Sequence, residues 1–344
     1  MNNQMSIEEA EFLLSQAGVP VIDADTNYWF VRTNGGENFE SFYFGNYIAI
    51  GWDKLNNLSA LTECPHDLLK KQIEENYPND TKPGNTASQI MRFVVEMKPG
   101  DYVLIPGANC DRIAFGKITS DAYIYQPTDQ DKMDAMFGES EVSFLKRRNV
   151  EWITSAPFER SEIDPLLIPI IYSYGTIVDA NPYSTFINRT LYDLYYYKGQ
   201  LHSVFNITRS SNIPAFEFNN FISNIFDAMD EYSEISGFEV DKKELYIKAA
   251  FNSPGPVEII TMATAAFTFL CGLSLFLNGA NVNLSYNIFN VATGEIKIDS
   301  PGLIEKLQKL SKTTTNNQLL LSQTEENLKH SKDVLNIKKK KKKK

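Results

Sequence analysis

Short apolar runs and alternating apolar and polar positions fill much of residues 27–155, and Gly, Pro and Asn separate them. This pattern is typical of short β-strands joined by turns. The segments that it predicts as strands are YWFVRT (28–33), YIAIGW (47–52), DYVLIPG (101–107), RIAFGKITSDAYIY (112–125, two strands) and NVEWITSAPF (149–158). Residues 66–78 and 85–97 are expected to form two helices. Many short strands with two small helices predict a small, partly closed β-barrel.

Four motifs in this region follow one another in an order known from one group of proteins. They are YWFVRTNGGENFESFYFGNYIAIGW, IMRFVVEMKPGDYVLIPG, IAFGKIT and RRNVEW. Together they resemble the PUA/EVE-like domain at the N-terminus of Mrr-type restriction endonucleases and related phage-defence proteins. The resemblance covers about 125 of the 344 residues. It implies a domain that binds nucleic acid, in several relatives by holding a flipped or modified base in an aromatic pocket.

Aromatic and basic residues in this region are candidates for contact with such a ligand. All three Trp of the chain lie here, with three Arg nearby in the sequence. Indole faces stack on bases, and guanidinium groups pair with phosphates or base edges. The alternative is that the Trp side chains form the barrel core and that the basic run is a solvated turn. The candidates are Trp29, Arg32, Trp52, Arg147, Arg148 and Trp152.

The rest of the chain alternates predicted helices and strands. Residues 166–180 are expected to form a strand, residues 185–207 a helix followed by two strands, and the residues after Pro214 a helix. Near the C-terminus, Leu321, Leu328 and Leu335 recur at heptad spacing, which indicates a short coiled coil or, as the favoured alternative, an amphipathic helix.

A capping box at Ser6 predicts a helix over 6–17, before the barrel. We expect four segments: 1–160, the PUA/EVE-like sensing domain with its N-terminal helix; 161–250, a middle α/β region; 251–312, a strand–helix–strand–helix region; and 313–344, a polar helical tail with a Lys run. The predicted fold class is therefore α+β, with an α/β C-terminal part that contains one long apolar helix.

That long helix is expected over residues 259–277, IITMATAAFTFLCGLSLFL, which contain no charge. Nineteen residues of helix span about 28 Å, close to the hydrocarbon thickness of about 30 Å. On a helical projection, Thr261, Thr264, Thr268 and Gly272 share one stripe opposite the larger apolar residues. This stripe suits helix–helix contact in a membrane or between copies of the chain. The alternative is a helix buried against the flanking strands of a soluble domain.

Composition narrows the classes of function. The formal net charge is −10, and because Lys338–Lys344 contributes seven positive charges, the remainder carries −17. An acidic body argues against non-specific coating of DNA. The three Cys are scattered, which indicates free thiols in a reducing compartment. The three His are also isolated, so no metal site and no cofactor is expected. No signal peptide is recognised, and the expected location is cytoplasmic, with association to the inner membrane if the apolar helix inserts.

Motifs for catalysis are missing from the sequence. It contains no phosphate-binding loop, nucleophile elbow or zinc-protease helix. Glu295 and Lys297 form an E-x-K pair of the kind that nucleases use, but no acidic strand precedes it convincingly. The leading hypothesis is a non-enzymatic bacterial anti-phage protein that senses a nucleotide or nucleic acid and acts as a homo-oligomer. The inner membrane is a possible partner in this hypothesis. The alternatives are a soluble nucleic-acid-binding module without membrane action and, less favoured, a degenerate nuclease.

Overall fold

The chain forms two compact units, which we describe separately from a computed structural model. The structure describes residues 11–12, 14–15, 18–129, 131, 144–236, 241–249, 255–262, 264–278 and 322–340. Residues Asp25–Ile187 with Lys341–Lys344 make up one unit, which we call the half-barrel unit. Residues Met1–Ala24 with Asn188–Lys340 make up the other, the C-terminal unit.

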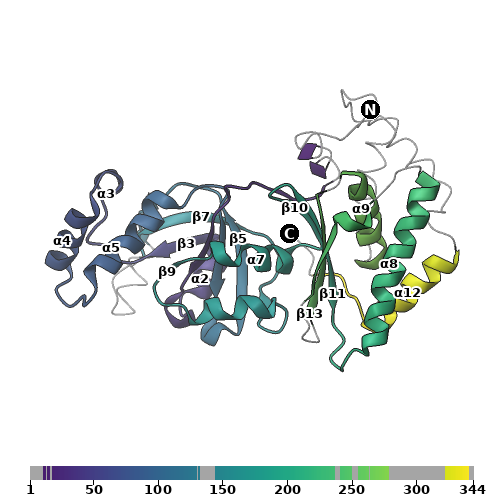
Figure 1. The fold of residues 1–344 in the computed structure, drawn as a ribbon. Helices are drawn as coiled ribbons and strands as arrows, with labels where there is room; N and C mark the ends of the chain where they lie inside the picture. Colours follow the sequence, from purple (N-terminus) through teal and green to yellow (C-terminus); the bar gives the residue numbers. More distant parts are fainter. Residues whose placement is uncertain are drawn as a thin grey trace. The chain divides into compact units, whose positions relative to one another are not determined.

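The half-barrel unit is built on an eight-stranded sheet that curls without closing (Figure 1). Its path runs β3-β7-β5-β4-β2-β9, with β6 paired to β7 and β8 paired to β5. Strands β2 and β4 are parallel, and the other pairs are antiparallel. The strands are β2 (Tyr28–Val31), β3 (Tyr47–Ile50), β4 (Tyr102–Pro106), β5 (Arg112–Ile118), β6 (Tyr123–Ile124), β7 (Lys146–Trp152), β8 (Phe158–Glu159) and β9 (Ile177–Asp179). The prediction of an α+β fold with a partly closed barrel is confirmed at this level.

Helices fill the connections of this sheet. They are η1 (Asn34–Gly36), α2 (Phe39–Gly45), α3 (Leu58–Thr62), α4 (His66–Asn76), α5 (Pro83–Met91), the π-helical turn η2 (Arg92–Glu96), η3 (Ala108–Cys110), η4 (Pro165–Tyr172) and η5 (Asn181–Tyr183). The Asn57 side chain accepts a hydrogen bond from the Ala60 N–H and caps α3. Pro83 begins α5, where its missing N–H costs no hydrogen bond. Ile73 and Ile90 are fully buried and attach α4 and α5 to the core of the sheet.

The apolar segment 165–172 forms the 3₁₀ helix η4, where the sequence pattern predicts a strand. Two prolines, Pro165 and Pro169, lie in this segment. Proline cannot donate to a strand ladder and is favoured at the first turn of a helix. The Asp164 side chain also caps the turn by accepting from the Leu166 N–H. The strand is therefore limited to the three residues of β9.

The C-terminal unit contains a five-stranded sheet in the order β1-β10-β11-β13-β12. Its strands are β1 (Val21–Ile22), β10 (Leu194–Tyr197), β11 (Gln200–Ile207), β12 (Leu245–Ala249) and β13 (Gly255–Thr261). Only β1 and β10 are parallel among these pairs. Lys198 and Gly199, with φ of 50° and 76°, form the tight turn between β10 and β11. This hairpin confirms the strand–strand prediction for the Tyr-rich segment.

Helices cover one face of this sheet. They are α8 (Ala215–Ser236), α9 (Thr264–Asn278) and α12 (Ser322–Leu335); α7 (Ser184–Leu191) contains the boundary between the units, and η6 (Lys242–Glu244) is a short turn. Helix α12 packs against α8 and also contacts α9. Leu328 and Leu335, two of the heptad leucines of the tail, are fully buried in the same core as α8 and α9. The polar helix of the tail is thus amphipathic and packs within this unit.

The apolar segment 259–277 does not form one long helix, so that part of the fold prediction is wrong. Ile259–Thr261 belong to β13, which pairs with β11 and β12, and helix α9 begins only at Thr264. Fifteen residues of helix extend about 22 Å, well short of a hydrocarbon core of about 30 Å. No helix in the described parts of the chain is long and apolar enough to cross a membrane. The segment is apolar because Leu270, Leu273 and Leu277 are buried with β11 in one core.

Several sequence predictions fall outside the described residues. They concern most of the N-terminal helix over 6–17, the strands and helix expected over 281–312, and the E-x-K pair at Glu295 and Lys297. They stay predictions.

Candidate functional site

Strand β7 of the half-barrel unit separates two kinds of side chain. Its sequence, KRRNVEW, places Lys146, Arg148, Val150 and Trp152 in the interior, whereas the residues between them face outward. This follows from the two-residue period of a strand. Arg147 and Asn149 therefore lie on an outer face with β3 on one side and β6 on the other. We call the outer face of these three strands the β7 face.

Arg147 is stacked on two tyrosine rings of the β7 face. Its guanidinium carbon lies 4.1 Å from the Tyr47 ring centroid and 3.5 Å from the Tyr125 ring centroid. The Arg147 Nε donates to the Phe144 carbonyl at 3.1 Å. Among the described residues, none accepts a hydrogen bond from its terminal nitrogens. All three side chains are half-buried. The stack thus holds a planar cation while leaving its strongest donors for another partner.

Hydrogen bonds of the hydroxyl groups fix the tyrosines of this face. The Tyr47 hydroxyl lies 2.6 Å from Ser41 Oγ, and the Tyr125 hydroxyl donates to Asp131 Oδ2 at 2.7 Å. On the neighbouring strand, the Tyr123 hydroxyl donates to Asn149 Oδ1 at 2.8 Å. Rings with fixed orientations lose little entropy when a flat ligand stacks on them.

The carboxylate beside Tyr125 is strongly stabilised in its charged form. Hydrogen bonds from the Thr128 side chain, from Tyr125 and from the Thr128 backbone lower the pKa of Asp131 to about 2. The same contact raises the pKa of Tyr125, since the hydroxyl donates to a carboxylate. Tyr125 therefore keeps its proton and Asp131 keeps its charge at neutral pH. The hydrogen bond to Asp131 thus holds the hydroxyl end of the Tyr125 ring in place.

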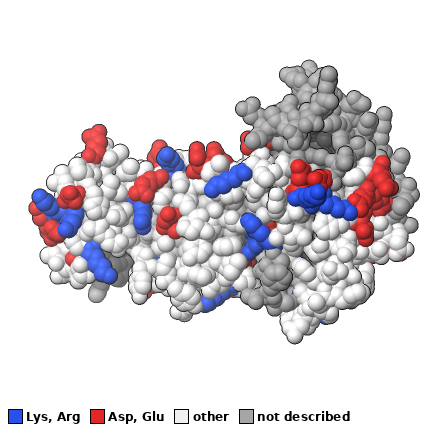
Figure 2. Space-filling model, viewed as in Figure 1, with Lys and Arg blue, Asp and Glu red and all other residues white. Residues whose placement is uncertain are grey.

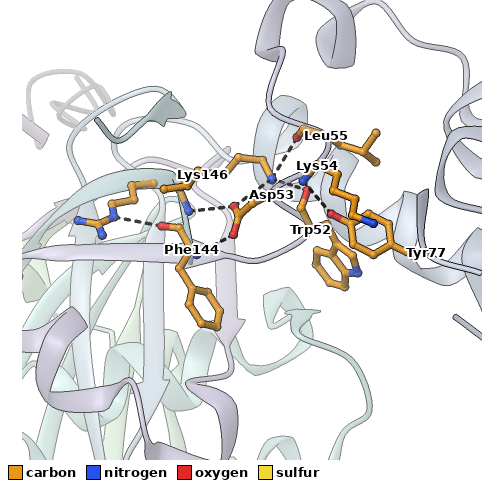
Figure 3. Close-up of polar contacts among 9 residues, drawn as sticks. Trp52, Asp53, Lys54, Leu55, Tyr77, Phe144 and Lys146 are labelled. Atoms are coloured by element: carbon orange, nitrogen blue, oxygen red, sulfur yellow. Dashed lines mark hydrogen bonds and ion pairs between the residues drawn. The ribbon is translucent and has the colours of Figure 1, made fainter. Parts of the chain in front are cut away.

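Behind the β7 face, the loop after β3 is fastened to β7 by one ion pair (Figure 3). The Lys146 ammonium lies 3.5 Å from Asp53 Oδ1 and donates to the carbonyls of Trp52 and Leu55 at 2.9 and 3.1 Å. In Figure 3 the Asp53 carboxylate points toward Lys146 and Phe144, and the Trp52 indole points away from them. Trp52 adopts a left-handed backbone with φ of 59°. For a large side chain this conformation is strained and persists only where contacts hold it.

Lys54 and Tyr77 extend this loop toward α4. The Lys54 N–H donates to the Tyr77 hydroxyl at 2.9 Å, and the Lys54 ammonium lies 5.4 Å from the centroid of the same ring. The Trp52 indole remains partly exposed beside them. Of the predicted ligand residues, Arg32, Trp52 and Arg147 are half-buried, and Arg147 is the one that lies over two tyrosine rings.

The other two predicted tryptophans are core residues. Trp29 is 4% exposed and its indole N–H donates to Asp101 at 2.9 Å; Trp152 is 2% exposed and its N–H donates to the Tyr43 carbonyl at 2.7 Å. Buried indoles with a satisfied N–H are packing elements. The geometry favours the core interpretation for both, and ligand contact by either is not supported by their position.

Arg32 and Arg148 use their donors inside the unit. Arg32 donates to the carbonyls of Ile171, Ser173 and Gly175, and so anchors the segment after η4. Arg148 is 1% exposed and donates to the carbonyls of Phe93, Val94 and Ser120. Burial lowers the pKa of Arg148 from its usual value. Both guanidinium groups hold backbone segments together inside the unit. Neither is therefore placed to contact a ligand together with Arg147.

The predicted membrane or oligomer face does not form one helical stripe. Thr261 is a buried residue of β13, whereas Thr264, Thr268 and Gly272 lie on α9. The side chains of Thr264 and Thr268 lie outside the described residues. Gly272 is half-buried. Since the strand ends before the helix begins, the four residues cannot share the helical projection that grouped them.

A buried polar cluster in the C-terminal unit has no counterpart in the sequence predictions. Glu258 in β13 is fully buried and accepts from the Tyr195 hydroxyl at 2.7 Å and from His202 Nδ1 at 2.8 Å. Arg189 Nη1 lies 3.7 Å from its other oxygen, and the Tyr195 and His202 rings are stacked at 4.4 Å. Burial alone would raise the pKa of Glu258, but the His202, Tyr195 and Arg189 contacts outweigh it and lower the pKa. A single Glu in an otherwise apolar strand is the only sequence signal of this cluster.

Charge and metal-binding groups are not concentrated in the described residues. On the face that Figure 2 shows, Lys and Arg side chains are interspersed with Asp and Glu. No three His, Cys, Asp or Glu of the described residues come together in a way that could hold a metal ion. All three Cys are unbridged and buried.

Comparisons with known proteins give one family model whose match lies within the half-barrel unit. A family model described as a domain of unknown function (DUF8426) matches residues 29–167, which lie within this unit. No curated protein matches the chain. A crystal structure of the YTH domain of Zygosaccharomyces rouxii MRB1 protein in complex with N6-methyladenosine RNA is similar over 50% of this chain and 90% of that chain. The sequence identity is 12% and the TM-score 0.28, so this similarity supports no conclusion about the ligand.

Proposed function

We propose that the half-barrel unit binds single-stranded nucleic acid on the β7 face. The observation that carries this proposal is the stack of Arg147 between Tyr47 and Tyr125. A guanidinium held flat between two rings directs its terminal N–H groups along one plane, which suits two oxygens of a phosphate or the O6 and N7 edge of guanine. Tyr123 beside it offers a further half-buried ring on which a base can stack.

A single strand fits this face better than a duplex. Duplex binding by backbone contacts requires several cations that neutralise phosphates along a groove. Of the three cations of β7, Arg147 alone faces outward, because Lys146 and Arg148 are occupied in the interior. Aromatic side chains stack on unpaired bases, which a duplex does not present. Asn149 is exposed on the same strand, and its amide nitrogen can donate to a base edge.

The cellular setting in this proposal is phage defence. It rests on the resemblance of the ordered motifs to PUA/EVE-like domains of defence proteins. In this scheme the half-barrel unit senses a nucleic-acid signal and the C-terminal unit responds through self-association. Action on the inner membrane is not part of the proposal, because it depended on a spanning helix over 259–277, and those residues form a strand end and a shorter helix.

The test is the affinity of the purified chain for short fluorescein-labelled RNA and DNA single strands, with the matching duplexes as competitors. Arg147→Gln should weaken single-strand binding about tenfold or more, since stacking and planar hydrogen bonds of this kind contribute about 1–3 kcal/mol. Lys71→Gln removes the same charge from an exposed position on α4 of the same unit and should leave the affinity unchanged. Equal binding by wild type and Arg147→Gln would refute the proposal, as would the absence of any binding.

A further inference from the structure

We infer that Asp53 is a positioning residue for the β7 face, because its single carboxylate fixes both the guanidinium of Arg147 and the ring of Tyr125. Asp53 itself lies behind this face, in the loop after β3, and is 22% exposed. The inference rests on the proposed function, since it concerns how the same site is held. It assigns a role to a residue that neither stacks on a base nor contacts one.

The two oxygens of Asp53 bind two consecutive backbone amides. Phe144 N–H donates to Oδ2 and Leu145 N–H donates to Oδ1, each at 2.9 Å. The carbonyls of the same two residues hold the stack. Phe144 O accepts from Arg147 Nε at 3.1 Å, and Leu145 O accepts from the Tyr125 N–H at 2.7 Å. One carboxylate therefore sets the position of two carbonyls, and these set the position of the guanidinium and of one of its two rings.

The backbone on both sides of this contact is strained. Trp52 and Phe144 have φ of 59° and 61°, in the left-handed region that large side chains avoid. Such residues are energetically costly and are kept only where surrounding contacts determine them. Lys146 holds the Trp52 side of this contact, because its ammonium pairs with Asp53 and donates to the Trp52 carbonyl (Figure 3). Without a side chain at position 53 that accepts both hydrogen bonds, we expect the Phe144 backbone to leave its strained left-handed conformation.

Replacing Asp53 with asparagine tests the hydrogen bonds of the carboxylate without changing the size of the side chain. Asp53→Asn keeps the shape of the side chain but replaces one accepting oxygen with an NH₂ donor, which cannot accept from either amide. One of the two backbone anchors is then lost. We expect the Phe144–Leu145 segment to shift and Arg147 to lose its fixed orientation. Single-strand affinity should fall about tenfold, comparable to the loss of one charge-assisted hydrogen bond.

A double-mutant cycle tests this role on the full chain. Affinities for the same labelled single strand are measured for wild type, Asp53→Asn, Arg147→Gln and the double variant. If Asp53 acts through Arg147, the double variant binds about as weakly as Arg147→Gln alone. A general structural effect would instead multiply the two losses. Asp67→Asn, at an exposed position at the start of α4, is the matched control and should bind like wild type.

Folding is monitored separately so that the outcome is decisive. All three tryptophans lie in the half-barrel unit, so urea unfolding followed by tryptophan fluorescence records that unit alone. If Asp53→Asn is unfolded, the Asp53→Asn/Lys146→Met pair takes its place, since it removes both charges together and leaves no unpaired ammonium. Wild-type affinity in a folded position-53 variant, or multiplied losses in the cycle, would overturn the role of Asp53. An unaffected Arg147→Gln would overturn the proposed function itself.

Discussion

Lys146 and Asp53 form an ion pair in which the ammonium is completely buried and the carboxylate is 22% exposed. Burial lowers the pKa of Lys146, and Asp53 opposes this shift. The pair joins the loop after β3 to strand β7 directly behind the β7 face. Besides pairing with Lys146, Asp53 accepts hydrogen bonds from the N–H groups of Phe144 and Leu145. Lys146 in turn donates to the carbonyls of Trp52 and Leu55. The loss of either side chain therefore leaves two of these backbone groups without that partner.

Replacing Lys146 with methionine should destabilise the half-barrel unit by about 3 kcal/mol, because removing one member of a buried pair leaves the other charge uncompensated. Urea unfolding followed by tryptophan fluorescence measures the change. Lys71→Met, on the exposed surface of α4, should cost less than about 0.5 kcal/mol. Equal midpoints for the two variants would mean that the pair contributes nothing to this unit.

Salt dependence should distinguish the two contributions to binding. Arg147→Gln removes one cation, so the slope of log affinity against log salt should decrease by about 0.7 for a single strand if the cation meets a phosphate. Tyr47→Leu removes a stacking ring without changing charge, and it should weaken binding with the slope unchanged. If Arg147→Gln weakens binding and also keeps the slope, Arg147 contacts a base edge and not a phosphate. A slope change in Tyr47→Leu would contradict the stacking role.

The C-terminal unit should lose stability in acid through Glu258. Its pKa is lowered in the folded protein, so its contribution is fully present above the ordinary carboxyl pKa of about 4.5 and is lost as the pH falls below that value. Glu258→Gln should therefore flatten the acid side of the stability profile. Urea unfolding followed by circular dichroism between pH 3 and 7 measures this, with tryptophan fluorescence as the separate record of the other unit.

Glu244→Gln is the control for this acid dependence, because Glu244 is exposed in η6. Its profile should follow that of the wild type. Should Glu258→Gln show an unchanged loss of stability in acid, the Tyr195, His202 and Arg189 contacts do not favour the charged carboxylate as the geometry implies.

Leu270→Arg should prevent folding of the C-terminal unit. Leu270 is completely buried in α9, within the core that contains β11 and β13. A guanidinium at this position would lose its hydration with no partner, at a cost of several kcal/mol. Met262→Arg, just before the helix, places the same charge at a position that is 58% exposed and should be tolerated. Resistance to limited proteolysis compares the two variants. A Leu270→Arg variant as resistant as wild type would show that α9 is not packed in this core.

Several elements could be predicted because their signals are local. The short strands YWFVRT and YIAIGW, the two successive strands of the Tyr-rich segment and the helix after Pro214 each follow from a few neighbouring residues. The prediction for 259–277 was wrong because apolar composition does not distinguish a strand end from a helix start. In the folded chain Ile259–Thr261 pair with β12 on one side and β11 on the other, and β11 lies more than 50 residues earlier in the sequence.

The candidate site shows the same limit. Arg147 and Trp52 were chosen for their chemistry; both are partly exposed, and Arg147 lies over two tyrosine rings. Trp29, Trp152 and Arg148 were chosen on the same chemistry and are buried with satisfied donors. No local pattern links Arg147 to Tyr47 and Tyr125, which come from two other segments of the chain.

The sequence by itself determined the α+β class, the short strands of the half-barrel and the presence of stacking and cationic groups in it, since these depend on local periodicity and residue type. Only the tertiary structure decided which of Lys146, Arg147 and Arg148 faces outward, which rings meet the guanidinium, and that Asp53 fastens them. The physical reason is strand register. A shift of one residue in the pairing of β7 with β3 and β6 would turn Arg147 inward and Lys146 outward, and register is set by contacts between distant segments.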